Sequence, residues 1–547
     1  GIAAALGHIY AEDNWQVHFR DTMRGGKMLN SWRMAQLHAQ EAPERVFELE
    51  TWGALFDRTK DGRISQRPFG GHRYDRLAHV GDRTGLEMIR TLQQHAVHKG
   101  IDVFMECTIS RLLKDGDRIA GALGYWREKG DLILFKAKAV VLATGGVGKA
   151  FKITSNSWEY TGDGHSLAYW AGADLIDMEF VQFHPTGMVW PPSVRGILVT
   201  EGVRGDGGTL TNSAGDRFMF KYIPEYFKAE TADTEEEADR WFQDKVNNRR
   251  TPDLLPRDEV ARAINAEIKA GRGSPHGGVY LDIASRQPVE YIKRRLPSMY
   301  HQFKRLADVD ITTTPMEVGP TMHYMMGGVR VDPDTAAATV PGLFAAGECA
   351  GGMHGANRLG GNSLSDLVVF GRRAGLAAAE YAKTLSATPA VNPSEVDECA
   401  TDMLGHFERS GEENPYQVQM ELQDTMQDLV GIIRTASELE QALEKVQTYK
   451  ERAERTGVEG NRQYNPGWHL AMDLRSLLTV SEAIALAALE RKESRGAHTR
   501  DDYPNTSGDF GGVNVVIRQG PDGAPQVSQE PLPQMPAELK ALFEEGK

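Results

Sequence analysis

Cysteine is scarce in this sequence. Its 547 residues include three cysteines, Cys107, Cys349 and Cys399, which lie far apart and form no C-x-x-C pair. This spacing excludes a disulfide framework and an iron–sulfur site held by this chain alone, and it is consistent with a reducing cytoplasm. We expect no metal site.

Long apolar runs and an excess of positive charge are also absent. No stretch approaches the roughly 18 apolar residues that span a bilayer. Lys and Arg number 62 and Asp and Glu number 76, and the resulting formal net charge of −14 argues against a nucleic-acid-binding protein. A negative total still permits a locally positive pocket.

The usual loops for binding phosphates are missing as well. No complete G-x-G-x-x-G follows a predicted strand, and Ala150 stands where a P-loop needs Ser or Thr. The sequence starts at Gly1 without methionine and without a leading strand. We therefore expect a chain cut from a longer protein, with the pyrophosphate turn upstream; a processed mature terminus is the alternative.

Glycine, by contrast, is abundant: 57 residues, about one in ten, against a usual share of about 7%. Apolar runs at 139–144 and 342–347 predict two buried parallel strands of an α/β nucleotide-binding fold. The polar stretch between them predicts an inserted domain over that fold. Residues 366–375 and most of 394–495 predict helices, and we expect an extended tail from about Gln519.

Two carboxylates lie where a nucleotide fold could use them. Asp163 lies in a Gly-Asp-Gly turn, and Glu348 follows the second predicted strand. A carboxylate after a parallel strand can accept hydrogen bonds from ribose hydroxyls. Each signal alone is weak, because Gly-Asp-Gly is more often only a turn.

Stronger signals come from polar residues embedded among glycines and small residues. A single histidine or arginine in such a place is more often structural than functional. Here the motifs recur along the chain, at 65–71, 82–85, 184–187, 198–205, 256–258, 323–328, 355–364 and 493–498.

Together these motifs resemble the succinate dehydrogenase and fumarate reductase flavoprotein family. The agreement runs in order from Gly1 to about Pro504 and is most similar to the actinobacterial type, notably from Trp158 through Arg204. The resemblance implies an α/β protein with a Rossmann-like FAD-binding domain, truncated at its N-terminus, an inserted α+β capping domain and a C-terminal helical domain. The implied boundaries are 1–185 and 323–385 for the FAD-binding domain, 186–322 for the cap, 392–497 for the helical domain and 498–547 for a C-terminal segment.

The resemblance also implies the cofactor. The family binds FAD, usually through a histidine in an S-H-T-x-x-x-x-G-G motif, and Gly1 resembles the last glycine of that motif. The attachment histidine is therefore expected upstream of Gly1. The residues of this chain that match FAD contacts of the family are Gly1, Asp163, Glu348, Ser363 and Leu364.

A dicarboxylate site is implied by the same resemblance. Its matching residues are His184, Thr200, His323 and Arg358, with Phe69 packing against substrate and flavin or, alternatively, only in the core. Arg358 can clamp one carboxylate of succinate with two parallel hydrogen bonds. The histidines and Thr200 can hold and twist the other, and fixed orientation lowers the entropic barrier.

Proton transfer is implied for Arg257. A guanidinium is a poor base, with a pKa above about 12, so it needs a relay, which Glu201 and Arg204 match. The implied reaction moves a hydride from one methylene of succinate to flavin N5 and a proton from the other methylene to Arg257. One departure is Met322, where many relatives have cysteine; we expect it to affect packing alone.

The family further implies partners. Electrons would pass from this protein to an iron–sulfur subunit, and then to membrane anchor subunits that reduce quinone, with this protein lying peripherally on the cytoplasmic face of the membrane. Three alternatives remain: fumarate reduction by the same site, an L-aspartate oxidase, and a non-catalytic docking scaffold. The intact Arg257, His184 and Arg358 argue against the scaffold.

Overall fold

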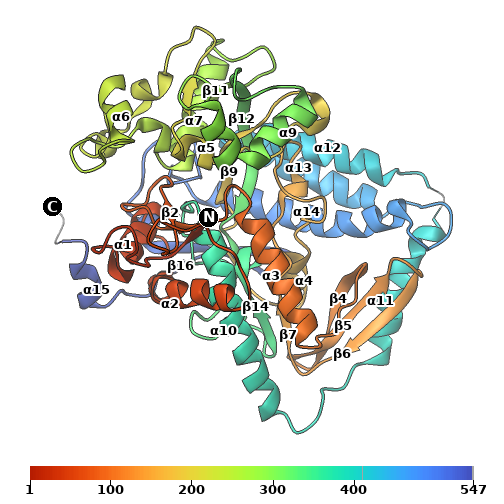
Figure 1. The fold of residues 1–547 in the computed structure, drawn as a ribbon. Coiled ribbons are helices and arrows are strands. Elements are labelled where there is room, and N and C mark those ends of the chain that lie inside the picture. The colour runs from red at the N-terminus through yellow and green to blue at the C-terminus, as the bar shows by residue number, and fades with distance from the viewer. Residues whose placement is uncertain (410, 545–547) are drawn as a thin grey trace.

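The computed structural model describes residues 1–409 and 411–544. The N-terminal part forms small sheets flanked by helices (Figure 1). Its elements are β1 (Ile2–Ala3), α1 (Trp15–Gly25), α2 (Trp32–Thr51), β2 (Gln66–Arg67), β3 (Leu77–Ala78), α3 (Thr84–His98), β4 (Cys107–Asp115), β5 (Arg118–Trp126), β6 (Asp131–Lys136), β7 (Val140–Leu142), α4 (Asp163–Trp170) and β8 (Leu175–Ile176).

The two strands predicted from apolar runs are present and pair in parallel. Strand β14 (Leu343–Ala345) aligns with β7, with Leu343 opposite Val140. Glu348 follows β14, and the predicted helix after Leu364 is α10 (Asn362–Thr384). The middle of the chain therefore leaves the nucleotide fold after β8 and has returned to it by β14.

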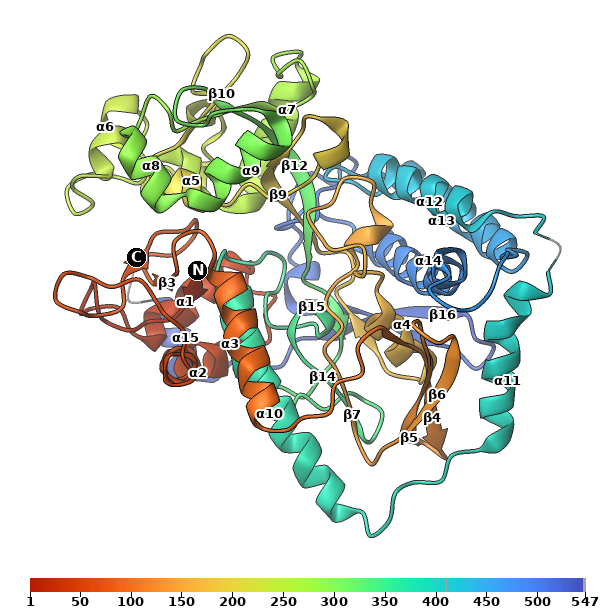
Figure 2. The same cartoon turned by 45° about the vertical axis from the view of Figure 1, so that its right-hand side comes forward.

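The segment from β9 to β12 builds a separate layer over the N-terminal part (Figures 1 and 2). Its antiparallel sheet has the order β10-β11-β12-β9 and its own hydrophobic core, which includes Leu210, Val279, Leu281 and Val318. Its elements are β9 (Val181–Met188), α5 (Gly202–Gly205), β10 (Thr209–Thr211), α6 (Glu235–Trp241), α7 (Arg257–Lys269), β11 (Val279–Asp282), α8 (Val289–Arg295), α9 (Pro297–Ala307) and β12 (Met316–Met325). We call this layer the cap.

The predicted helical region follows and packs beside the sheets (Figure 2). It contains α11 (Pro393–Leu404), α12 (Pro415–Leu429), α13 (Ala436–Ala453) and α14 (Pro466–Glu490). Leu422 and Met426 of α12 are fully buried, as their spacing predicts. Within the described residues, no helix is long and apolar enough to cross a membrane.

The expectation of an extended tail from about Gln519 is wrong in part. The tail forms β16 (Pro525–Pro531), which pairs antiparallel with β15 (Val513–Gln519), and a short helix, α15 (Ala537–Ala541). Strand β15 in turn pairs with β8, which pairs with β13 (Gly328–Val329). The tail is ordered because the edge of this sheet supplies hydrogen-bond partners that the local sequence does not reveal.

Candidate active site

Two paired strands of the cap bring the predicted histidines together. Strand β9 carries His184 and β12 carries His323, and Thr321 lies opposite His184 in the antiparallel register. A register shift between Met322 and Tyr324 leaves His323 without an opposite residue, as in a β-bulge. The two imidazole centroids lie 5.0 Å apart at 67°.

Both imidazoles are neutral near pH 7. Burial lowers the pKa of His184 well below its ordinary value, and the charges of Arg257, His323 and Arg204 add to the effect. Burial and the neighbouring Arg358 and Arg257 do the same to the pKa of His323. Neutral rings can donate or accept one hydrogen bond at each nitrogen without adding charge to a site already rich in arginine.

A glutamine links the two predicted arginines. Gln182 precedes His184 by two residues on β9, so the two side chains lie on the same face of the strand. Its Oε1 accepts hydrogen bonds from Arg358 Nη2 at 3.0 Å and from Arg257 Nη1 at 3.4 Å. Its Nε2 donates to the Asn357 side chain and to the Arg358 carbonyl, both at 2.8 Å. Two cations thus converge on one amide oxygen.

Arg358 is held from three sides, by Ser363, Tyr324 and Gln182. Its Nη1 donates to Ser363 Oγ at 2.9 Å, and its guanidinium lies 4.1 Å from the ring centroid of Tyr324. Its buried Nε has no hydrogen-bond partner among the described residues. Burial and the charge of Arg257 lower the pKa of Arg358 to about 9, so it remains protonated at pH 7.

Arg257, Glu201 and Arg204 form a continuous buried chain. Arg257 is the first residue of α7, and its Nε donates to Glu201 Oε2 at 2.7 Å. Glu201 Oε2 lies 3.9 Å from Arg204 Nη2, while Glu201 Oε1 accepts from the Gly70 amide at 2.6 Å. Burial alone would raise the pKa of Glu201, but Arg257 and Arg204 together lower it to about 2. The carboxylate therefore stays ionised between the two cations.

Phe69 lies beside this chain, and the loop before α10 packs against Phe69, Arg257 and Glu201. A Cβ added to Gly360 would lie 2.6 Å from Phe69 Cδ2, 2.9 Å from Arg257 Nη2 and 3.1 Å from Glu201 Oε2. Thr200 shows contacts within its own segment: its Oγ1 accepts from the Gly202 amide at 3.2 Å. The structure thus brings Phe69 near Arg257 and Glu201, but among the described residues Thr200 makes no hydrogen bond to the other predicted site residues.

Two of the predicted cofactor residues are carboxylates in places suited to hydroxyl donors. Glu348 is buried, accepts a 3.0 Å hydrogen bond from the Met325 amide and makes no ion pair with a described residue. Burial raises its pKa to about 7. A Cβ on Gly146 would lie 2.1 Å from Glu348 Oε1, so any other residue there would displace this carboxylate. Asp163 begins α4 and accepts from Thr161 Oγ1 at 2.6 Å; burial raises its pKa.

The other three predicted cofactor residues gather at the start of α10. Ser363 and Leu364 lie in its first turn, after Gly361 with φ +88°. The carbonyl oxygen of Gly1 lies 3.2 Å from where a Cβ on Gly361 would be. The first turn of a helix offers unpaired N–H groups and a partial positive charge, which suit a polar or anionic edge of a ligand.

Several residues at the site were missed by sequence reasoning. Gln182 could have been found from its position two residues before His184, because residues two apart on a strand share a face. Ser155, whose Oγ lies 2.7 Å from His323 Nδ1, and Asn156, which donates to the His323 carbonyl at 2.8 Å, carry no such signal. They come from a loop that is distant in sequence from β12.

Two family models match this chain. A family model described as FAD binding domain matches residues 1–364, and one described as Fumarate reductase flavoprotein C-term matches residues 419–541. Fold and site together define a flavin-dependent oxidoreductase. The Glu348 carboxylate, which has no cation beside it, fits the ribose hydroxyls of FAD. The open first turn of α10 fits the polar edge of the flavin ring.

Three relatives identify the family. The fumarate reductase flavoprotein subunit of Haemophilus influenzae is 35% identical over 97% of this chain and 86% of its own length. The succinate dehydrogenase flavoprotein subunit of Coxiella burnetii is 38% identical over 92% of this chain and 84% of its own length. The solved structure of Mycobacterium smegmatis Sdh1 in complex with UQ1 is 60% identical, with a TM-score of 0.84, over 100% of this chain and 89% of its own. The chain belongs to the succinate dehydrogenase and fumarate reductase flavoprotein family, as its motifs predict.

Proposed function

We propose that this chain is the catalytic flavoprotein subunit that oxidises succinate to fumarate. The observation that carries the proposal is the convergence of Arg257 and Arg358 on Gln182 beside the two neutral histidines. Two guanidinium groups around one small polar space suit a ligand with two carboxylates, and neutral imidazoles add directional hydrogen bonds without further repulsion.

The residues divide the work. Arg358, with a free Nε, clamps one carboxylate, and His184, His323 and Thr200 orient the other. FAD, when bound, supplies the acceptor for the hydride. Arg257 gives a proton to the Glu201 carboxylate, which its Nε contacts at 2.7 Å, and takes the proton from the second methylene in its place; Glu201 and Arg204 carry the released proton onward. Gly1, Asp163, Glu348, Ser363 and Leu364 are the proposed FAD contacts.

The relay needs little rearrangement. Glu201, with a pKa of about 2, holds a proton only briefly and returns to the ionised state between two cations. The ionised carboxylate is thereby in position to accept a proton from Arg257. Covalent attachment of FAD through a histidine upstream of Gly1 belongs to the same proposal.

Electrons must then leave this chain. Its three cysteines lie on separate elements and cannot hold a cluster together. We propose that the acceptor is an iron–sulfur subunit with membrane anchor subunits beyond it, and that this chain is peripheral on the cytoplasmic face of the membrane. The relative from Mycobacterium smegmatis, described in complex with UQ1, supports a quinone as the final acceptor.

Fumarate reduction is the second candidate, because relatives carry both names and the same site serves both directions. The alternatives of an L-aspartate oxidase and a docking scaffold are less favoured. The amino group of L-aspartate would bring a cation toward two arginines, which disfavours the oxidase. The buried chain of Arg257, Glu201 and Arg204 would serve no role in a non-catalytic scaffold.

Replacement of Arg257 tests the proposal. In the complete flavin-loaded enzyme, Arg257→Ala is expected to lower kcat for succinate by at least about a thousandfold, as loss of a proton-transfer group does, with flavin absorbance retained. Lys269→Ala, an exposed cation at the other end of α7, is the matched control and should leave kcat unchanged. Oxidation of succinate by Arg257→Ala at the wild-type rate would refute the assignment, and turnover of L-aspartate by the wild type would favour the oxidase.

A further inference from the structure

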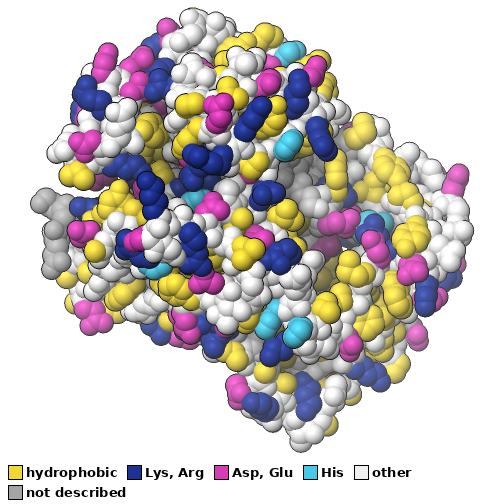
Figure 3. All heavy atoms as spheres, viewed as in Figure 1, with side chains coloured by type: hydrophobic (Ala, Val, Ile, Leu, Met, Phe, Trp, Pro, Cys, Tyr) yellow, Lys and Arg dark blue, Asp and Glu magenta, His cyan; other side chains and the backbone are white. Residues whose placement is uncertain are grey.

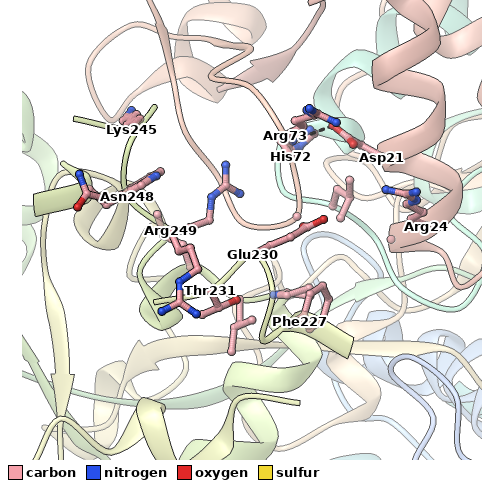
Figure 4. Close-up of a pocket in the computed structure, with 18 of the residues that line it drawn as sticks. Asp21, Arg24, His72, Arg73, Phe227, Glu230, Thr231, Lys245, Asn248 and Arg249 are labelled. Carbon is pink, nitrogen blue, oxygen red and sulfur yellow. Dashed lines mark hydrogen bonds between the residues drawn. The ribbon is translucent and has the colours of Figure 1, made fainter. Parts of the chain in front are cut away.

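A cavity lies outside the catalytic and cofactor residues assigned so far. It has a volume of about 430 Å³ and opens between α1, the segment after Phe69 and the loops of the cap. Figure 4 shows Lys245 and Asn248 on one side of it and Arg24 and Arg73 on the other, with Glu230 reaching between them. On the face seen in Figure 3, basic side chains gather along the junction of the cap with the N-terminal part.

The charge of this cavity is opposite in sign to that of the whole chain. Its walls hold six Lys or Arg side chains and two carboxylates, Asp21 and Glu230. Asp21 is already paired with the buried Arg76 at 2.8 Å. Lys245 pairs with Asp75, and Arg249 pairs with Glu237. Of the residues that the structure describes, none offers a carboxylate within 4.0 Å of the remaining four cations, Arg24, Lys27, Arg73 and Arg250.

Among these four cations, Arg250 gives the strongest indication of an anion-binding site. It lies 5.4 Å from the ring centroid of Trp241, and its Nη1 makes one long hydrogen bond, 3.4 Å, to the Phe69 carbonyl. Burial lowers its pKa. A guanidinium with five donors in a partly dry place, with one weak acceptor, is poised for an anion.

The cavity shares its inner wall with the catalytic site. Leu255 and Pro256 line it and directly precede Arg257, and Leu359 lines it and directly follows Arg358. The Leu359 side chain is wedged between two glycines: a Cβ on Gly25 or on Gly71 would lie 2.5 Å or 2.4 Å from its Cδ2. The same backbone that positions the arginines therefore separates them from the cavity.

We propose that this cavity is an outer binding site at which a free dicarboxylate dianion docks before it passes Leu359 to reach Arg257 and Arg358. The inference rests on the proposed function. A chain with a net charge of −14 repels a dianion at long range, and its catalytic arginines are almost fully buried. A cationic cavity at the rim focuses the field and raises the local concentration of the anion, which speeds association by roughly 10- to 1,000-fold in known cases.

The test separates the association rate of a dicarboxylate from its dissociation rate. Malonate binding to the flavin-loaded holoenzyme is followed by rapid mixing and flavin absorbance, with the double substitution Arg24→Gln and Arg73→Gln. We expect the association rate to fall by about tenfold at low ionic strength and by less than about twofold near 0.5 M salt, because screening removes the attraction. The dissociation rate should not change, since neither side chain touches the inner site.

Two further variants sharpen the result. Lys60→Gln with Lys99→Gln removes two exposed charges far from the cavity walls and should leave both rates unchanged. Glu230→Gln removes the carboxylate that reaches across the cavity and should raise the association rate. A wild-type association rate in the Arg24 and Arg73 variant, or a change confined to dissociation, would overturn the outer site while leaving the proposed function intact. Absence of malonate binding by the wild type would overturn both.

Discussion

At the scale of single residues, Arg358 has the clearest electrostatic signature. It is a buried cation beside a second cation, and both effects lower its pKa to about 9, although it remains charged at pH 7. Tyr324 and Ser363 hold its plane, and Gln182 fixes its distance from Arg257. Its protonation state therefore decides whether a carboxylate can be clamped.

This property predicts a pH dependence. The protonated guanidinium binds the carboxylate, so kcat/KM for succinate should be constant below about pH 8.5 and fall by about tenfold per pH unit above pH 9. The value of kcat at saturating succinate should fall at a higher pH, because the bound carboxylate raises the pKa of Arg358. The measurement is a pair of pH profiles for the flavin-loaded enzyme, and a level kcat/KM up to pH 10.5 would contradict it.

At the scale of elements, the loop before α10 and the strands β9 and β12 were predictable to different degrees. Apolar runs predicted the parallel pair β7 and β14, because such runs are buried on both faces whatever their neighbours. The motif around Arg358 marked the loop as functional. The bulge at His323 and the partner residue Ser155 were not predicted, because they depend on which segments lie together and in which register the strands pair.

The same loop gives a sharp mutational prediction. Gly360→Ala would place a methyl group against Phe69, Arg257 and Glu201, so the loop must shift, and displacement of catalytic groups by about 1 Å can lower activity about 100-fold. We expect a loss of that size in kcat/KM with retained flavin. Gly371→Ala, in open space within α10, is the control; it should keep wild-type kinetics and stabilise the helix by about 0.5–1 kcal/mol. Equal kinetics for both variants would contradict the close packing around Gly360.

At the scale of the whole molecule, the site is assembled from the cap and the nucleotide fold together. His184, Arg257 and His323 come from elements of the cap, whereas Arg358 and Phe69 come from segments of the nucleotide fold. The polar stretch between the two apolar runs predicted an inserted layer. The path of the tail could not be predicted, because β16 is fixed by pairing with β15 and not by its own apolar pattern.

A ligand that contacts both the cap and the nucleotide fold should stabilise the whole protein. Malonate at about 100 times its dissociation constant is expected to add about 2.7 kcal/mol to the free energy of unfolding of the holoenzyme, by mass action. The thermal midpoint should rise with malonate in the wild type and stay unchanged in Arg358→Met, which removes the clamp. Scanning calorimetry or a dye-based melt would measure it. An equal rise in both proteins would show binding elsewhere.

The pairing of β9 with β12 limits how this protein can be recombined with its relatives. Because His184 and His323 lie inside the two strands that join the cap to the body, the predicted boundaries at 185/186 and 322/323 each cut through a strand. A chimaera spliced there would join half-strands from different parents and mix their registers. Splice points before Val181 and after Met325 keep the hydrogen bonds between β9 and β12 within one parent. The cap and its two histidines then come from the same parent.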